Sequence, residues 1–204
     1  MSTLNAYLEI SDALCGAGWI SLQHFLEPKL VEALHAELLA HMRSDALTPA
    51  LIGRGPRQQL REDIRGDRTR WLTGAGEAQR LLFEHLKTLR TTLNRTLFIG
   101  LEDFEAHYAL YPPGARYQRH IDSFRGDNLR RVSLVLYLNP HWRRHDGGLL
   151  RLYTPKGALI EEVMPEAGRA VCFLSEEFPH EVTQTRRPRA SIACWFRIRP
   201  VEAL

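Results

Sequence analysis

The sequence predicts a mainly β fold with supporting α-helices in a single domain. From about residue 100, short runs of β-branched and aromatic residues are separated by Pro, Gly and Asn turns, as in an antiparallel sandwich or barrel. Before that point, apolar residues recur at helical spacing. The 204 residues suffice for one substantial core, so we expect helical support and a loop over about 1–99 and a β core over about 100–204. The expected strands cover residues 104–111, 117–121, 131–138, 149–153, 170–174, 180–185 and 190–198.

Two amphipathic helices are expected in the front half. After a short apolar segment at residues 19–22, Pro28 stands where the first turn of a helix accepts proline. One helix follows Pro28, and a second runs through about residues 77–93. We interpret both apolar stripes as core. They comprise Leu30, Val31, Leu34, Leu38 and Met42 in the first helix and Leu81, Leu82, Leu86, Leu89 and Leu93 in the second.

The segment between these helices, residues 52–76, is rich in Gly and Arg and lacks a helical period. A surface loop of this length usually serves function or is disordered. We expect residues 54–73 to form a lid that is mobile alone and ordered by substrate. Gly53, Gly55 and Gly66 would permit the large backbone changes that such a lid needs.

Composition and charge argue against several classes of protein. The net charge is +3 and the pI about 8.9, but basic and acidic residues are interleaved, which favours a solvated surface over a nucleic-acid stripe. The start of the chain has no signal-peptide pattern, and no stretch approaches the roughly 18 apolar residues of a membrane span. We therefore expect a cytoplasmic protein with no membrane partner. Cys15, Cys172 and Cys194 are expected to be reduced core thiols.

The segment His120-Ile121-Asp122, followed by His180 and Arg189, is the most informative feature of the chain. His120 and Asp122 lie two residues apart at an expected strand end, so their side chains project from the same face. Two imidazoles and one carboxylate hold a divalent ion and leave positions open, as in non-haem Fe(II) oxygenases. Arg189 adds a cation for an acidic co-substrate. A His-x-Asp pair alone is weak support, because His180 could equally cap a strand and Asp122 support a turn.

Further motifs surround these residues from about residue 60 onward. They are Ile64-Arg65-Gly66-Asp67 with Trp71, Tyr111-Pro112-Pro113-Gly114, Tyr117-x-Arg119-His120-Ile121-Asp122, Tyr137-Leu138-Asn139, Gly147-Gly148-x-Leu150-Arg151, Pro179-His180-Glu181-Val182 and Arg189-Ala190-Ser191-Ile192. Their order resembles that of the prolyl 4-hydroxylases of the hypoxia-sensing type and their bacterial relatives. The resemblance implies a distorted double-stranded β-helix, a cupin-like jelly roll, with helices packed on one sheet. Strands distant in sequence become neighbours in that fold, so residues 122 and 180 can meet.

The resemblance also implies a co-substrate, 2-oxoglutarate, and roles for the residues around it. Arg189 would fork to its far carboxylate, Tyr137 would donate a hydrogen bond to the same carboxylate, and Tyr111 would be a second donor near the co-substrate. The alternative for Arg189 is a solvated member of a basic cluster, a role that suits Arg186 and Arg187 better. The implied Fe(II) ligands are His120, Asp122 and His180.

The expected substrate rim consists of Arg65, Asp67, Arg130 and Trp195, with Asp67 pairing with Arg130 in one state of the lid. Simple core is an equal alternative for Trp195, and a plain surface charge is the alternative for Arg130. His107 lies on a strand face that is expected to look into the same cavity. We interpret it as a structural histidine and leave it out of the ligand set.

The reaction that the resemblance implies consumes 2-oxoglutarate and O2, releases succinate and CO2, and hydroxylates C4 of a prolyl residue in an intracellular protein. Ascorbate is the expected reductant. Transcription factors and the translation apparatus are both open as sources of the substrate, nucleic acid is not expected as a partner, and the oligomeric state stays open. One alternative is an oxygenase acting on another protein side chain, a small molecule or nucleic acid. A non-enzymatic cupin-like metal sensor is a third reading, which gives Arg189 and Tyr137 no purpose.

Overall fold

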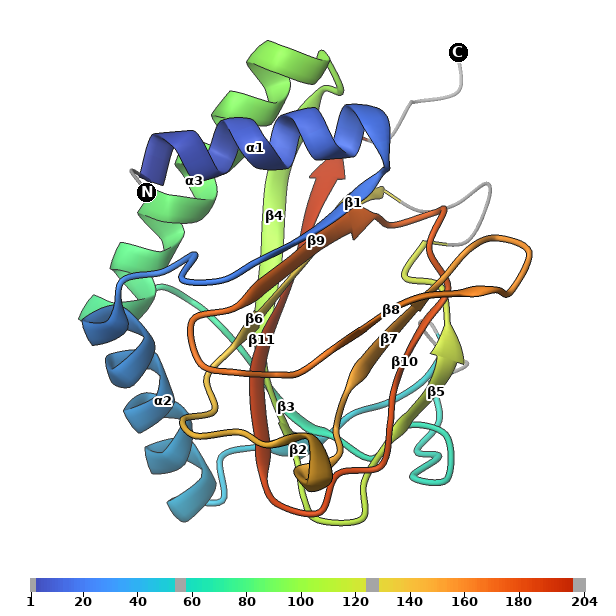
Figure 1. Cartoon of the computed structure of the whole chain (residues 1–204). Helices are drawn as coiled ribbons and strands as arrows, with labels where there is room; N and C mark the ends of the chain where they lie inside the picture. The colour runs from blue at the N-terminus through green and yellow to red at the C-terminus, as the bar shows by residue number, and fades with distance from the viewer. Residues whose placement is uncertain (1–2, 54–57, 124–128, 200–204) are drawn as a thin grey trace.

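The computed structural model describes residues 3–53, 58–123 and 129–199, and within them the chain is mainly β (Figure 1). Its helices are α1 (Thr3–Gly16), α2 (Pro28–Arg43) and α3 (Glu77–Leu97), with a 3-10 turn, η2 (Arg144–Asp146). Its strands are β1 (Trp19–Leu22), β2 (Thr48–Pro49), β3 (Arg68–Trp71), β4 (Leu101–Tyr111), β5 (Tyr117–His120), β6 (Arg130–Tyr137), β7 (Leu150–Tyr153), β8 (Leu159–Val163), β9 (Ala170–Leu174), β10 (His180–Val182) and β11 (Arg189–Ile198).

Strands that are far apart in sequence alternate within two sheets. The larger sheet has the order β1-β9-β6-β11-β4-β3-β2, and the smaller one has the order β5-β10-β7-β8. Each pairing between these strands is antiparallel. The predicted double-stranded β-helix is therefore confirmed, and the ligand-bearing strands β5 and β10 are direct neighbours in it.

The three α-helices lie on one side of the molecule, against the larger sheet (Figure 1). α2 begins at Pro28, as predicted, and its Leu34 and Leu38 are fully buried, as are Leu82 and Leu86 of α3. Burial of each such side chain contributes roughly 1.5–3 kcal/mol, so these stripes anchor the helices to the sheet. None of the helices in the described part of the chain is long and apolar enough to cross a membrane.

The helical predictions fail in three places. Met42 and Leu81 are 42% and 50% exposed, so their assignment to the core is wrong: each lies at the edge of its stripe. The helix α1 was not expected from the sequence. Its buried residues Tyr7, Ile10 and Leu14 recur at helical spacing, but the exposed Leu4 and Leu8 lie outside this stripe and obscure it in the sequence.

The expected lid, residues 54–73, is partly a fixed element. Residues 68–71 form β3, which pairs in register with β4, so the prediction of a loop is wrong there. Tertiary pairing with a long neighbouring strand decides this segment, which has no strong alternation of its own. Residues 54–57, including Gly55, lie outside the described residues, and the mobility of the remaining segment stays a prediction.

The strand β8 was also missed, because it is an edge strand with three polar or exposed positions out of five. The cysteine assignment needs one correction as well. Cys172 and Cys194 are buried free thiols, as expected, but Cys15, in the last turn of α1, is exposed.

Candidate active site

Three predicted metal ligands converge at the adjoining ends of β5 and β10. His120 and His180 are direct partners in the pairing of these strands, and Asp122 follows β5 by two residues. The Nε2 atoms of His120 and His180 each lie 3.7 Å from an oxygen of Asp122. The ligand atoms of all three residues lie within 4.8 Å of one another. This is the spacing that one divalent ion needs to contact all three.

The backbone fixes both imidazoles in the tautomer that a metal requires. Nδ1 of His120 lies 2.8 Å from the carbonyl oxygen of Gln118, and Nδ1 of His180 lies 3.0 Å from that of Phe178. Because a carbonyl oxygen only accepts, each Nδ1 carries the hydrogen and each Nε2 keeps its lone pair. Burial, and then the nearby His120, lower the pKa of His180 to about 4, so its ring is neutral at pH 7.

Asp122 is held as a carboxylate. Burial opposes its ionisation, but at the low pH where Asp122 would titrate, the charge of a protonated His180 and the hydrogen bond and charge of a protonated His120 hold the pKa of Asp122 well below its usual range. The side chain of Trp195 also hydrogen-bonds Asp122, and the Ser133 hydroxyl donates to its Oδ2 over 2.7 Å. The outer partners thereby orient the oxygen ligand.

Arg189 forms the second part of the site, with only 1% of its surface exposed. Its Nε donates to the carbonyl oxygen of Gly148 over 2.8 Å, and its Nη1 donates to the Ser191 hydroxyl over 3.2 Å. Its Cζ lies 5.0 Å from the ring centre of Tyr111 and 5.1 Å from that of Tyr137. Within the described residues, Nη2 has no hydrogen-bond partner.

The buried hydroxyl of Tyr137, like Nη2 of Arg189, has no hydrogen-bond partner among the described residues. Burial raises the pKa of Tyr137 to about 12 and that of Tyr111 well above its ordinary value, so both hydroxyls keep their protons. Buried donors normally find an acceptor. An N–H of Arg189 and an O–H of Tyr137 left over at one place fit the carboxylate of a bound acid.

One cavity of about 850 Å³ connects the two parts of the site. Its lining includes the three predicted metal ligands together with Arg189 and Tyr111. Tyr137 does not line the cavity but packs behind it, against the guanidinium of Arg189. The structure thus brings together a metal-binding triad and a buried cationic grip, as the sequence predicts.

Comparison with known proteins agrees with this geometry. Residues 106–197 match the model of the 2OG-Fe(II) oxygenase superfamily. The solved structure of a Pseudomonas putida prolyl-4-hydroxylase is 45% identical to this chain, with a TM-score of 0.87 over 95% of this chain and 100% of that one. The chain belongs to the 2OG-Fe(II) oxygenase superfamily.

Other members of the superfamily extend the comparison. A Trichoplax adhaerens prolyl hydroxylase, solved with a peptide of the hypoxia inducible factor oxygen degradation domain, is 25% identical, with a TM-score of 0.85 over 96% of this chain and 90% of that one. Human prolyl hydroxylase EGLN3 is 30% identical over 70% of this chain, and human Egl nine homolog 1 is 32% identical over 66% of it. The oxygenase spans 63% and 33% of the lengths of these two curated relatives.

Membership of the superfamily establishes the cofactors. The oxygenase requires Fe(II), 2-oxoglutarate and O2. The residues fit these cofactors: two imidazoles and a carboxylate for the metal and unpartnered donors for the acid, with the metal ligands and Arg189 lining one cavity.

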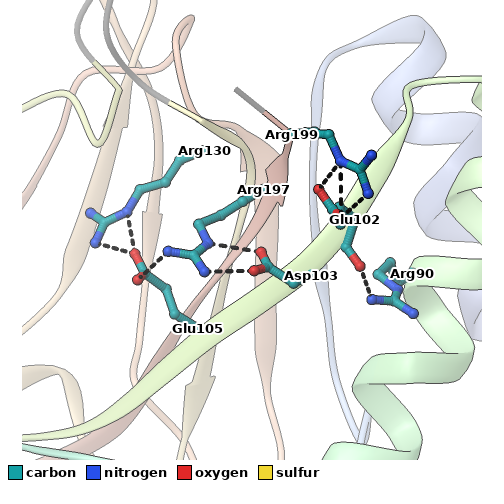
Figure 2. Close-up of polar contacts among 7 residues, drawn as sticks. All are labelled: Arg90, Glu102, Asp103, Glu105, Arg130, Arg197 and Arg199. Carbon is teal, nitrogen blue, oxygen red and sulfur yellow. Dashed lines mark hydrogen bonds and ion pairs between the residues drawn. The ribbon is translucent and has the colours of Figure 1, made fainter. Parts of the chain in front are cut away.

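The four residues predicted as the substrate rim of the oxygenase all line the cavity, but their charge pairing differs from the prediction. Arg65 donates to both oxygens of Asp67, over 2.7 and 3.0 Å, while Arg130 donates to Glu105 over 2.8 Å (Figure 2). This structure therefore shows other partners for Asp67 and Arg130, and their expected pairing in another state of the lid stays a prediction. Trp195 is buried and also lines the cavity, with Cζ of Arg130 3.7 Å from its ring centre.

Sequence reasoning missed several supporting residues. Ser133 and Ser191 occupy inward positions of β6 and β11, and the phase of these strands was the signal for them. The ring of Tyr117 stacks on His120, with centroids 3.6 Å apart. Glu105 had no local signal, since its partner Arg130 is on another strand.

Gly148 supports the cationic grip and gives a testable prediction. Its φ is +63°, and a Cβ there would lie 2.8 Å from Cδ of Arg189. We expect Gly148→Ala to lose roughly 1–2 kcal/mol of stability and to weaken 2-oxoglutarate binding by displacing Arg189. Urea unfolding and calorimetric titration measure the two effects. Gly100→Ala is the matched control, because Gly100 has φ +67° but open space around its Cβ: it should lose stability and keep its 2-oxoglutarate affinity.

Proposed function

We propose that this oxygenase is a prolyl 4-hydroxylase that acts on a prolyl residue of a protein and releases succinate and CO2. The observation that carries the proposal is a His-Asp-His triad that shares one cavity with a buried, incompletely partnered Arg189. The relatives named as prolyl hydroxylases support the choice of substrate, above all the Pseudomonas putida enzyme, to which the chain is similar over nearly its whole length.

Each part of the site has a defined task in this reaction. The triad would hold Fe(II) through two Nε2 atoms and an oxygen of Asp122, and Arg189 and Tyr137 would bind the far carboxylate of 2-oxoglutarate. Fe(II), when bound, would supply the redox chemistry by which one oxygen atom of O2 goes to the C–H bond and the other to 2-oxoglutarate, which becomes succinate and CO2. The protein orients the reacting C–H bond and keeps bulk water away, which the burial of His180 and Asp122 serves.

A prolyl residue suits this cavity because its ring fixes φ and presents a C–H edge without a long side chain to order. Recognition then depends on the flanking residues, for which Arg65, Asp67, Arg130 and Trp195 are placed at the rim. We further propose ascorbate as the reductant, the cytoplasm as the compartment, and a transcription factor or a protein of the translation apparatus as the substrate.

The two alternative functions make different demands on these residues. A non-enzymatic metal sensor leaves the buried donors of Arg189 and Tyr137 without a role. A nucleic-acid oxygenase needs a basic groove with stacking aromatics, whereas each arginine of the rim described above is paired with an acidic residue, Asp67 or Glu105.

The decisive experiment is oxygen incorporation into protein. A cell lysate is treated with the Fe(II)-loaded oxygenase and 2-oxoglutarate, and mass spectrometry locates the peptides that gain one oxygen. We expect the gain on C4 of a proline, and replacing that proline by alanine should abolish both the gain and the substrate-stimulated release of succinate. Oxygen on lysine, asparagine or a free metabolite would keep the oxygenase assignment and reject prolyl hydroxylation.

A further inference from the structure

One histidine in the cavity wall has no part in the proposed reaction. His107 on β4 is only 4% exposed, and it lines the same cavity as the metal triad. Its ring packs between Trp71 on β3, with centroids 5.1 Å apart, and Trp195 on β11, with centroids 5.2 Å apart. Trp195 in turn carries the guanidinium of Arg130 from β6. Four neighbouring strands thus form one wall of stacked side chains.

A row of ion pairs holds one end of this wall in place (Figure 2). Glu105 accepts from Nε of Arg130 over 2.8 Å and from Nη1 of Arg197 over 3.0 Å. Arg197 is itself fixed by two hydrogen bonds to Asp103, of 2.8 and 2.6 Å. Because Arg130 is anchored through Glu105, its guanidinium is held over Trp195, and Trp195 is held against the imidazole. The wall is organised before a substrate arrives.

The tautomer of His107 follows from its one described hydrogen bond. Nδ1 lies 3.0 Å from the carbonyl oxygen of Tyr108, which can only accept, so Nδ1 carries the hydrogen. Burial is the main cause that lowers the pKa of His107 to about 4, so the ring is neutral at pH 7. Nε2 is therefore a lone-pair acceptor in the cavity wall, and no described residue donates to it.

The surrounding charges select the kind of donor that this acceptor takes. Among the charged groups that act on His107, Arg65 and Arg130 lower its pKa and Asp67 raises it. Two guanidiniums near the ring disfavour a cationic donor such as an ammonium group. A neutral N–H or O–H suffers no such repulsion and can complete the hydrogen bonding of Nε2.

We propose that Nε2 of His107 accepts a hydrogen bond from a backbone N–H of the peptide next to the target proline, and so determines how the substrate chain is oriented. This inference rests on the proposed function. A prolyl residue has no backbone N–H, so the donor must belong to a flanking residue. A backbone N–H is neutral, present in every sequence and fixed in direction, which suits an acceptor that is itself fixed by the wall.

Two variants of His107 distinguish the effect of losing the Nε2 acceptor from the effect of losing the volume of the ring. His107→Asn keeps a polar atom near the position of Nδ1 and removes Nε2, whereas His107→Gln places its amide oxygen near the position of Nε2. With a degenerate peptide library that has a central proline as the probe, His107→Asn should raise KM about tenfold, the loss of one hydrogen bond. His107→Gln should recover part of this loss. His145→Asn, at an exposed histidine, is the control and should match the wild type. Equal KM values for wild type and both His107 variants would overturn the proposal.

The same library supplies the complementary change on the substrate. One form carries an N-methyl group on the residue after the proline, another carries it on the residue before, and a third is unmodified. Wild-type enzyme should turn over one of the methylated forms about tenfold less well than the unmodified one, while His107→Asn should not discriminate between them. If His107→Asn still turned over the methylated peptide less well than the unmodified one, another residue would accept the substrate's backbone N–H, and the proposal would be overturned.

A readout without turnover separates this inference from the proposed function. In enzyme labelled with ¹⁵N-histidine and loaded with Zn(II) and 2-oxoglutarate, the nitrogen shifts of His107 should show a protonated Nδ1 and a bare Nε2. The Nε2 signal should move when the unmodified library is added. If the Nε2 signal moves but no proline gains oxygen, the proposed prolyl hydroxylation is rejected, while the role of His107 as a hydrogen-bond acceptor is supported. A protonated Nε2, or a signal that does not move, overturns the acceptor whatever the turnover shows.

Discussion

Replacing His180 with alanine should abolish Fe(II) binding and 2-oxoglutarate turnover while leaving a folded protein. His180 supplies one of three ligand atoms that lie within 4.8 Å of one another, and two ligands alone do not retain the ion. The fold survives because the triad lies in a cavity between the sheets, apart from the main core beneath the helices. Anaerobic titration with Fe(II) and succinate release measure the loss, and circular dichroism verifies the fold.

The controls for this prediction use residues outside the site. His120→Ala should behave like His180→Ala, whereas His145→Ala should bind Fe(II) and turn over normally, since His145 is an exposed histidine. Full activity in either triad variant would show that the ligand assignment is wrong. Mn(II), Co(II) and Zn(II) should occupy the wild-type site without supporting turnover, because affinity there does not discriminate between divalent metals.

The core of the site could be predicted from sequence because its residues lie at positions that local patterns define. The phase of a strand places His120 and Asp122 on one face, and the short strand that begins at His180 pairs directly with β5. Arg189 likewise begins a strand, so its side chain points along the inner face of the larger sheet. In each case the spacing of two residues along a strand carries the information.

The partners of the rim could not be predicted, because they depend on which strands become neighbours. Arg130 meets Glu105 across β11, at a sequence separation of 25 residues, and no local pattern indicates that contact. Asp67 is taken by Arg65, two residues away, once β3 fixes the segment against β4. The same reason explains why β3 was predicted as a loop: its pairing partner, more than its own composition, makes it a strand.

The role of His107 was open for a related reason. Its phase on β4 places it in the cavity wall, but only the folded chain shows that Nδ1 is occupied by a backbone carbonyl and that no described residue donates to Nε2. Hydrogen-bond direction is a property of the tertiary structure and has no counterpart in composition or spacing.

Replacing Arg189 with lysine should weaken 2-oxoglutarate binding by roughly 1–3 kcal/mol, because a single ammonium replaces a planar fork in a site that is largely closed to water. The substitution also removes the geometry that lets one side chain donate to Gly148, to Ser191 and to a bound acid at once. Calorimetric titration of 2-oxoglutarate into the Zn(II)-loaded protein measures the loss directly.

Two further variants make the Arg189 result specific. Tyr137→Phe removes one hydroxyl and keeps the ring, so it should weaken 2-oxoglutarate binding by less than Arg189→Lys, about 0.5–1.5 kcal/mol. Arg187→Ala should leave the affinity unchanged, because that guanidinium lies over Trp142 and pairs with Asp146. If Arg187→Ala and Arg189→Lys weakened binding equally, the acid would be held by a diffuse basic patch instead of one buried cation. A loss confined to Arg189 and Tyr137 assigns the carboxylate to the two donors that the fold leaves unpartnered.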